Sequence, residues 1–169
     1  MTNEKILYAV APCSYGTILI AASDAGICAT TLGDDPQELV GHLQKRFPDA
    51  TLVGNDSAFK KMMHAMVTRV EHPGADMTAS LDLRGTAFQR AVWKALSKIP
   101  LGQTATYAQI ARKIDNPKAV RAVAQACAAN PVAIAIPCHR VVRSDGSLSG
   151  YRWGVERKRE LLRRESEIA

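Results

Sequence analysis

Residues 106–130, Thr-Tyr-Ala-Gln-Ile-Ala-Arg-Lys-Ile-Asp-Asn-Pro-Lys-Ala-Val-Arg-Ala-Val-Ala-Gln-Ala-Cys-Ala-Ala-Asn, decide the fold of the second half of the chain. The spacing predicts one helix over 106–114, with Thr106 as its N-cap, and a second helix over 118–129 opened by Pro117. Two short helices joined by a tight turn favour a helix-turn-helix, with which many proteins enter a DNA groove. An ordinary helical bundle gives the same pattern.

The second of these helices carries small side chains on nearly every face. Helix propensity alone explains so much alanine, since alanine is the strongest helix former. Small side chains also let a helix backbone come close to another surface, which is either a neighbouring helix or a nucleic-acid groove. Arg121 is the one long cation in the middle of this smooth surface, and Lys118 flanks it.

Around this stretch, the 169 residues predict two domains and an α/β (α+β) fold. In residues 1–83, apolar runs between turn signals predict strands and periodic segments predict helices: strands over Ile6–Val10, Thr17–Ala22 and Gly26–Leu32, helices over Pro36–Phe47 and Ser57–Val70. Residues 84–169 begin with a helix over Ala87–Lys98 that Thr86 can cap, and they are mostly helical.

Charge is distributed unevenly between the two halves. Residues 1–83 carry 6 Lys/Arg against 10 Asp/Glu, a net charge of −4, whereas residues 84–169 carry 16 Lys/Arg against 6 Asp/Glu, a net charge of +10. Such a division predicts that the second half meets a polyanion, nucleic acid above all. A solvated basic face without a partner is the alternative.

The same sequence argues against a membrane protein and against a metal site. The longest uncharged apolar runs, Ile6–Ile20 and Val132–Cys138, are interrupted or too short to cross a bilayer. No secretory signal pattern follows the start. We therefore expect a cytoplasmic protein whose four cysteines, at 13, 28, 127 and 138, remain reduced. None of them forms the closely spaced pair of a zinc knuckle, so a structural zinc site has weak support.

Cys138 is the candidate for a reactive group. The apolar run 132–136 has strand character and ends at Pro137, and His139 and Arg140 follow the thiol directly. Both neighbours can favour the thiolate, although a free cysteine is more often a small buried hydrophobe. In an extended segment His139 points away from the sulfur, so a bridging water is the natural relay.

An imidazole that removes a proton also needs a carboxylate to orient it. Three glutamates of the basic C-terminal helix could supply that carboxylate, namely Glu156, Glu160 and Glu165.

The second half of the chain, from about Gly85 to Glu165, resembles the O6-alkylguanine-DNA alkyltransferases (methylated-DNA--protein-cysteine methyltransferases). The resemblance rests on the segments Tyr107, Asn116-Pro-Lys-Ala-Val-Arg121, Ala129-Asn-Pro131, Ile136-Pro-Cys-His-Arg-Val-Val142, Gly150-Tyr-Arg-Trp-Gly154 and Lys158…Glu165. The loop 148–154 is most similar to the C-terminal part of bacterial adaptive-response (Ada) proteins. The first half is compatible with the variable N-terminal domain of the family.

The resemblance implies an RNase H-like α/β domain over 1–83, followed over 84–169 by a winged-helix-like domain with the helix-turn-helix. It implies direct, irreversible, single-turnover transfer of the alkyl group from O6-alkylguanine, and from O4-alkylthymine, to Cys138. The lesion would lie in double-stranded DNA bound through the minor groove, and its base would be flipped. No cofactor is needed, and the chain would act as a monomer. The zinc ligands that the family carries near its N-terminus are not reproduced, because Cys13 and Cys28 lack the matching histidine partners, so we predict no metal.

For single residues the resemblance implies that His139, oriented by Glu165, deprotonates Cys138 through a water. Tyr107 would help to rotate the flipped base and would protonate its N3 atom, and Asn130 would brace the turn that bears the thiol. Arg121 would take the place of the extruded base. The DNA contacts would come from Lys118, Arg121, Ala122 and Tyr107, and the substrate pocket from Pro137, Val141, Tyr151, Arg152 and Trp153.

Three other functions compete with alkyl transfer. A non-catalytic sensor of alkylated DNA would lack the acceptor thiol, so Cys138 argues against it. A winged-helix transcription regulator could use the cysteine as a redox or alkylation sensor. A cysteine hydrolase would turn over repeatedly and would not need a basic half. We also expect Trp153, which stands where vertebrate relatives carry a small residue, to narrow the pocket beside the alkyl group.

Overall fold

The computed structural model describes residues 3–74 and 80–168. Their contacts divide the chain into two units, Met1–Leu83 and Arg84–Ala169. The expected α/β fold, a sheet domain followed by a mostly helical domain, is confirmed. No helix within the described ranges combines the length and the apolar character needed to cross a membrane.

The first unit is built on a four-stranded sheet. Its strands are β1 (Lys5–Cys13), β2 (Gly16–Ser23), β3 (Gly26–Gly33) and β4 (Thr51–Val53), in the order β3-β2-β1-β4. Two tight hairpins make β1, β2 and β3 antiparallel, and β4 returns parallel to β1. The sequence did not predict β4, because three residues are too few for a periodic signal.

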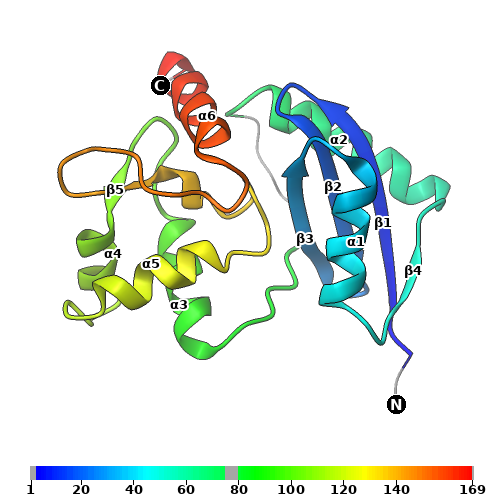
Figure 1. Ribbon diagram of the computed structural model, residues 1–169, viewed down its shortest axis with the longest axis horizontal. Coiled ribbons are helices and arrows are strands. Elements are labelled where there is room, and N and C mark those ends of the chain that lie inside the picture. Colours follow the sequence, from blue (N-terminus) through cyan, green and yellow to red (C-terminus); the bar gives the residue numbers. More distant parts are fainter. Residues whose placement is uncertain (1–2, 75–79, 169) are drawn as a thin grey trace. The chain divides into compact units, whose positions relative to one another are not determined.

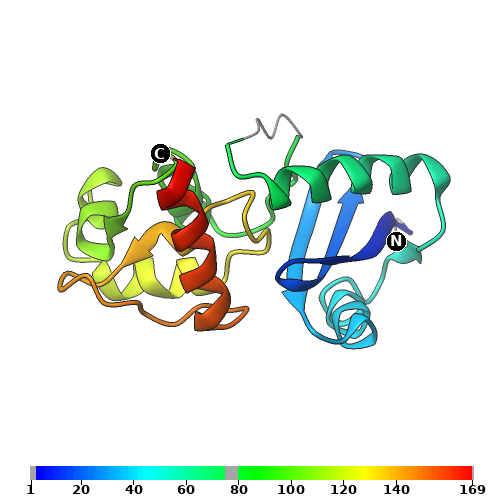
Figure 2. The same cartoon turned by 90° about the horizontal axis from the view of Figure 1, so that it is seen from above.

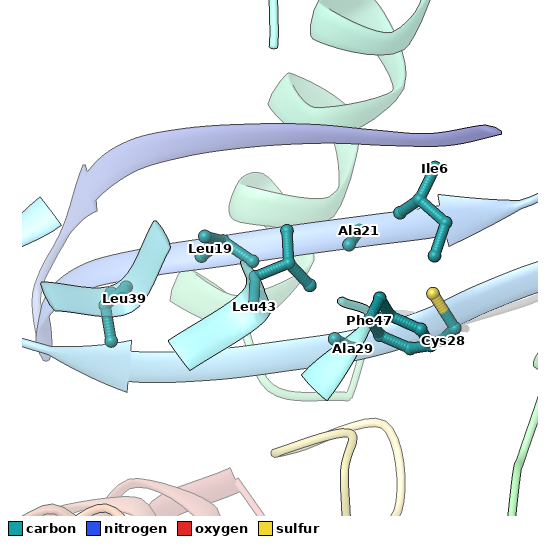
Figure 3. Packing of buried hydrophobic residues seen from close by; sticks show 8 residues of the cluster. All are labelled: Ile6, Leu19, Ala21, Cys28, Ala29, Leu39, Leu43 and Phe47. Atoms are coloured by element: carbon teal, nitrogen blue, oxygen red, sulfur yellow. The ribbon is translucent and has the colours of Figure 1, made fainter. Parts of the chain in front are cut away.

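Two helices cover the opposite faces of this sheet, α1 (Pro36–Arg46) and α2 (Ser57–Glu71) (Figures 1 and 2). Asp35 caps α1 and Asp56 caps α2, each through a side-chain oxygen that accepts a backbone N–H. Figure 3 shows the core beneath α1, where Leu39, Leu43 and Phe47 pack on apolar side chains of the three antiparallel strands.

The second unit consists of short helices and a two-stranded parallel ribbon. Its elements are α3 (Ala87–Leu96), β5 (Ala105–Thr106), α4 (Tyr107–Lys113), α5 (Val120–Ala128), the 3₁₀ turn η1 (Cys138–Arg140), β6 (Val141–Val142) and α6 (Val155–Ile168). Thr86 and Thr106 each form a capping box with a glutamine three residues later. Helix α5 begins two residues later than predicted, because Lys118 lies in a turn and the amide of Ala119 bonds to Asn116 O.

The helix-turn-helix pair α4 and α5 rests on α3 (Figure 1). Trp93 on α3 is 1% exposed, and its indole Nε1 donates to the carbonyl of Ala126 at 2.8 Å. This bond ties α3 to the last turn of α5, next to the residues that lead to Cys138. Val92, Leu96, Ile110 and Val123 complete the core around it.

We expect Trp93→Phe to destabilise the protein by about 1–3 kcal/mol, because the Ala126 carbonyl loses its buried donor and the smaller ring leaves space. Urea unfolding measures the free energy of unfolding directly. Lys94→Ala, on the exposed side of the same helix, is the control and should change it by less than about 0.5 kcal/mol. Equal effects of the two substitutions would contradict the assigned role of the indole.

Candidate active site

The segment that leads to the thiol is a compact turn, and the strand expected over 132–136 is wrong. Ile136 N bonds back to Val132 O at 3.1 Å, and Cys138 N bonds to Ile136 O at 2.8 Å. Ile134 has a φ of +69°, a left-handed conformation that is strained for a β-branched residue. The apolar run therefore fills the interior as a turn, and Cys138 opens the 3₁₀ turn η1 instead of continuing a strand.

Asn130 bonds to both ends of this turn. The residue is fully buried. Its Oδ1 accepts from Val132 N at 3.0 Å, while its Nδ2 lies 2.9 Å from Ile136 O and 3.1 Å from Cys138 Sγ. One carboxamide thus closes the turn at both ends and also donates toward the sulfur.

Behind the thiol lies a buried ion-pair network. His139 Nε2 is 2.7 Å from Glu165 Oε1, and the two side chains are 0% and 6% exposed. Arg140 makes a bidentate contact with the same carboxylate, Nε to Oε2 at 2.9 Å and Nη2 to Oε1 at 2.8 Å. Its Nη1 donates to Ile99 O at 2.7 Å, so the network joins η1, α6 and the loop that follows α3.

Glu165 is the partner of His139 among the three candidate glutamates. Glu156 pairs with Arg159, and Glu160 pairs with Arg163 and Arg164, all on α6 itself. Lys158, Leu161 and Glu165 are the buried positions of this helix. Their spacing of three and four residues places them on one face, which explains why Glu165 points inward and the other two do not.

The electrostatics fix the protonation of the pair. Burial opposes ionisation of Glu165, but the hydrogen bonds from His139 and Arg140 outweigh it and lower its pKa to about 2. Burial lowers the pKa of His139, although Glu165 opposes this effect. An ionised carboxylate accepts, so Nε2 of a neutral His139 carries the proton and Nδ1 keeps a lone pair. Nδ1 is buried and bonds to no group of the described chain.

Cys138 itself is buried and protonated at rest. Burial raises the pKa of its thiol to about 11, against the hydrogen bond from Asn130 and the positive charges of Lys158 and Arg152. The side chain is 5% exposed and reaches the wall of an open cavity of about 800 Å³. The cavity is lined by Tyr107, Arg121, Ala124, Cys127, Ala128, Cys138, Arg143, Ser149, Gly150, Tyr151 and Arg152.

Two of the five residues expected in the substrate pocket lie on this wall, Tyr151 and Arg152. Pro137, Val141 and Trp153 are not among the residues that line this cavity, and their contact with a substrate stays a prediction. Pro137 and Val141 are buried, and Val141 is the first residue of β6. Trp153 packs under the loop, 7% exposed, with its ring 5.2 Å from that of Tyr151 at an interplanar angle of 71°.

The residues expected to contact DNA are divided between the cavity and the exposed start of α5. Lys118, Arg121 and Ala122 are exposed, and Arg121 also lines the cavity. Tyr107, the first residue of α4, lines the cavity as well.

Two polar residues next to Tyr107 were not assigned from the sequence. The Tyr107 hydroxyl shares a short hydrogen bond with Ser149 Oγ, and Lys158 Nζ donates to the same oxygen at 3.0 Å. Lys158 is 1% exposed, and burial lowers its pKa while Cys138 opposes this shift. The sequence signal that could have identified Lys158 is its position on the C-terminal helix, where the spacing places a buried residue.

The four cysteines, all within the described residues, form no disulfide. In the described part of the chain, no three histidine, cysteine, aspartate or glutamate side chains gather into a group that could hold a metal ion. The arrangement brings together one thiol, an imidazole oriented by a carboxylate, and a cavity wall that carries arginines.

Comparisons with known proteins agree with this chemistry. Residues 87–167 match the model of the 6-O-methylguanine DNA methyltransferase DNA binding domain, and residues 6–68 match its ribonuclease-like domain. The chain is 53% identical over 165 residues to the bifunctional transcriptional activator/DNA repair enzyme Ada of Escherichia coli, covering 98% of the chain and 47% of that protein. It thus spans about half the length of this relative and of the regulatory protein ada of Salmonella typhimurium.

Two further relatives match over most of their own length. An inducible methylated-DNA--protein-cysteine methyltransferase of Bacillus subtilis is 45% identical over 126 residues, which cover 75% of this chain and 70% of the relative. The crystal structure of Mycobacterium tuberculosis OGT in complex with DNA superposes with a TM-score of 0.80 at 32% identity, over 96% of this chain and 94% of that one. The chain belongs to the 6-O-methylguanine DNA methyltransferase family.

Proposed function

We propose that this chain repairs DNA by transferring the alkyl group of O6-alkylguanine, and of O4-alkylthymine, to its own Cys138, once per molecule. The observation that carries the proposal is a thiol on a cavity wall backed by a neutral histidine whose partner is an ionised buried glutamate. In the transfer, the bond from sulfur to the alkyl carbon forms while the carbon–O6 bond breaks. The electron pair leaves with the base. Relatives named methylated-DNA--protein-cysteine methyltransferases support this proposal.

The proton of Cys138 leaves toward His139. Nδ1 of His139, which has a free lone pair, accepts the proton, and a water between Cys138 Sγ and this nitrogen relays it. Glu165 then stabilises the imidazolium that forms, because its carboxylate already accepts from Nε2 at 2.7 Å. Arg140 keeps that carboxylate ionised and in place.

The departing base takes up a proton at N3 from Tyr107. Burial raises the pKa of the Tyr107 hydroxyl, while the hydrogen bond with Ser149 opposes this shift, so the group holds its proton until the base needs it. Lys158 donates to Ser149 and so supports the hydroxyl through one intervening oxygen.

DNA contact is assigned to the second unit, which carries the net charge of +10. A base inside a duplex cannot reach Cys138, so it must leave the stack at a cost of a few kcal/mol. The small side chains of α5 suit entry into the minor groove, with Arg121 in the place of the extruded base. Phosphate contacts offset the cost without reading sequence. We propose that the chain acts as a monomer in the cytoplasm.

The nucleophile is tested by mixing the protein with a duplex that contains O6-methylguanine and locating the added methyl group by peptide mass spectrometry. We expect one methyl group per molecule, on Cys138, and none on a Cys138→Ala variant. The variant should still bind DNA, since the phosphate contacts come from other residues. Cys127→Ala removes the neighbouring cavity thiol and serves as the matched control, which should still be methylated. A methyl group on Cys13, Cys28 or Cys127 would refute the assignment, and repeated turnover would favour a hydrolase.

Arg121→Ala should slow methyl transfer from duplex DNA by roughly 10- to 100-fold, the equivalent of the few kcal/mol needed to unstack a base. Reaction with the free O6-methylguanine base, which needs no flipping, should change little. Single-turnover rates on both substrates measure the difference, and Arg159→Ala is the control for removing one exposed cation from the same unit. Equal losses on the two substrates would show that Arg121 is structural.

Glu165→Gln should lower the transfer rate by roughly 10²-fold or more, because a neutral amide does not hold the proton on Nε2. It should also lower stability at neutral pH by about 3 kcal/mol or more, since Arg140 and His139 lose a buried charge partner.

The pH dependence of the free energy of unfolding distinguishes the contribution of the Glu165 ion pairs from that of side-chain packing, which does not depend on pH. The pKa of Glu165 falls from the ordinary 4.5 to about 2 on folding, so its contribution is complete above 4.5 and is lost as the pH falls toward 2. The buried neutral His139 adds a loss in the same direction below 6.5. Urea unfolding at a series of pH values should show the gap between wild type and Glu165→Gln closing below pH 4.5. A gap that stays constant would contradict the network.

A further inference from the structure

The loop before α6 places three consecutive residues, Tyr151, Arg152 and Trp153, next to the cavity. Trp153 is buried, and its ring meets the ring of Tyr151 edge-on. The Arg152 guanidinium lies 5.6 Å from the centroid of the Trp153 ring, within the range of a cation–π contact. The indole is therefore a platform that holds the guanidinium, and this explains a tryptophan that does not touch the cavity.

From this platform Arg152 reaches the turn that bears the thiol. Its Nη1 donates to the backbone carbonyl of Asn130 at 3.1 Å. The side chain of the same Asn130 donates toward Cys138 Sγ at 3.1 Å. One residue thus separates the guanidinium from the sulfur, and both Arg152 and Cys138 line the cavity.

Charges of one sign surround the cavity. Its described wall holds three arginines, Arg121, Arg143 and Arg152, and no carboxylate. Lys158 on α6 adds a fourth cation through Ser149. Within the described chain, the hydrogen bond to Asn130 and the ring contact are the partners of Arg152, and no carboxylate pairs with it.

The other titratable groups near the sulfur do not supply a compensating charge. Tyr107 on α4 and Cys127 on α5 are both protonated at rest, because burial raises the pKa of each, that of Cys127 to about 12. Glu165 is engaged by His139 and Arg140. Lys158 and Arg152 both lower the pKa of Cys138.

We propose that Arg152 is a positioning residue for the Cys138 thiolate: it fixes the Asn130 turn and gives the cavity wall beside the sulfur a permanent positive charge. When Cys138 loses its proton toward His139, Arg152 and Lys158 stay protonated, so the cavity gains one negative charge, on the sulfur. Arg152 offsets that charge. The inference deepens the proposed function, because it concerns the same thiol.

The test compares two reagents that alkylate the same thiolate and differ in charge, iodoacetate and iodoacetamide. The rates of both reactions depend equally on the thiolate fraction of Cys138 and on its accessibility. The rate with iodoacetate divided by the rate with iodoacetamide therefore reports the local charge at Cys138. Because Arg152 is partly exposed and therefore screened, we expect Arg152→Gln to lower this ratio by about threefold, equivalent to half a pKa unit. Arg152→Lys, which keeps the charge, should restore most of the ratio.

Arg159→Gln is the matched control, since it removes one cation from α6 where the side chain pairs with exposed Glu156. It should leave the ratio unchanged. The rates are followed by peptide mass spectrometry on the protein without DNA, so failure of alkyl transfer from DNA would not affect the result. An Arg152→Gln ratio equal to that of wild type or of Arg159→Gln would overturn the proposal.

A second measurement addresses the thiolate directly. Ultraviolet titration of each protein, minus the titration of the same protein with Cys138→Ala, gives the pKa of the Cys138 thiol. We expect Arg152→Gln to raise this pKa by about half a unit and Arg152→Lys to return it toward the wild-type value. A variant that reacts more slowly while its thiol pKa is unchanged would show a merely structural role and would also overturn the proposal.

Discussion

The buried carboxylate of Glu165 is the interaction on which the rest of the site depends. It joins three segments of the second unit: α6, which bears it, the 3₁₀ turn η1 with His139 and Arg140, and, through Arg140 and Ile99 O, the loop that follows α3. A buried charge is tolerated only when it is paired and hydrogen-bonded. This one has partners on both oxygens, so the pairing fixes the position of η1 and the proton on His139.

The thiol owes its position to a second constraint, the turn that Asn130 closes. Ile134 is held in a left-handed conformation that a β-branched residue adopts at a cost of about 1–3 kcal/mol. Three hydrogen bonds of one carboxamide hold the turn in this form, and one of them ends on the sulfur. The Asn130 carboxamide therefore has two roles, since it stabilises the turn and also donates a hydrogen bond toward the sulfur of Cys138.

Local patterns predicted most of the elements, and their failures have physical causes. The capping threonines and the apolar spacing were enough for the helices, since both signals act within a few residues. The segment 132–136 looked like a strand because its residues are apolar and alternate positions are β-branched, yet its conformation depends on Asn130 and on burial. The position of Trp153 under the loop also depends on tertiary packing. A buried position for Lys158 could have been predicted, because a lysine three residues before a buried leucine stands on the apolar face of the helix.

A thiol that is consumed in one reaction must be protected from other electrophiles. Burial raises the pKa of Cys138 to about 11, so the resting thiol is protonated at pH 7. Asn130, Lys158 and Arg152 each oppose that shift without abolishing it. A base that enters the cavity expels water and strengthens these same interactions, since they act in a medium of lower dielectric constant. In the proposed function the site therefore keeps the thiol inert while the cavity is open to solvent, and the substrate itself completes its activation.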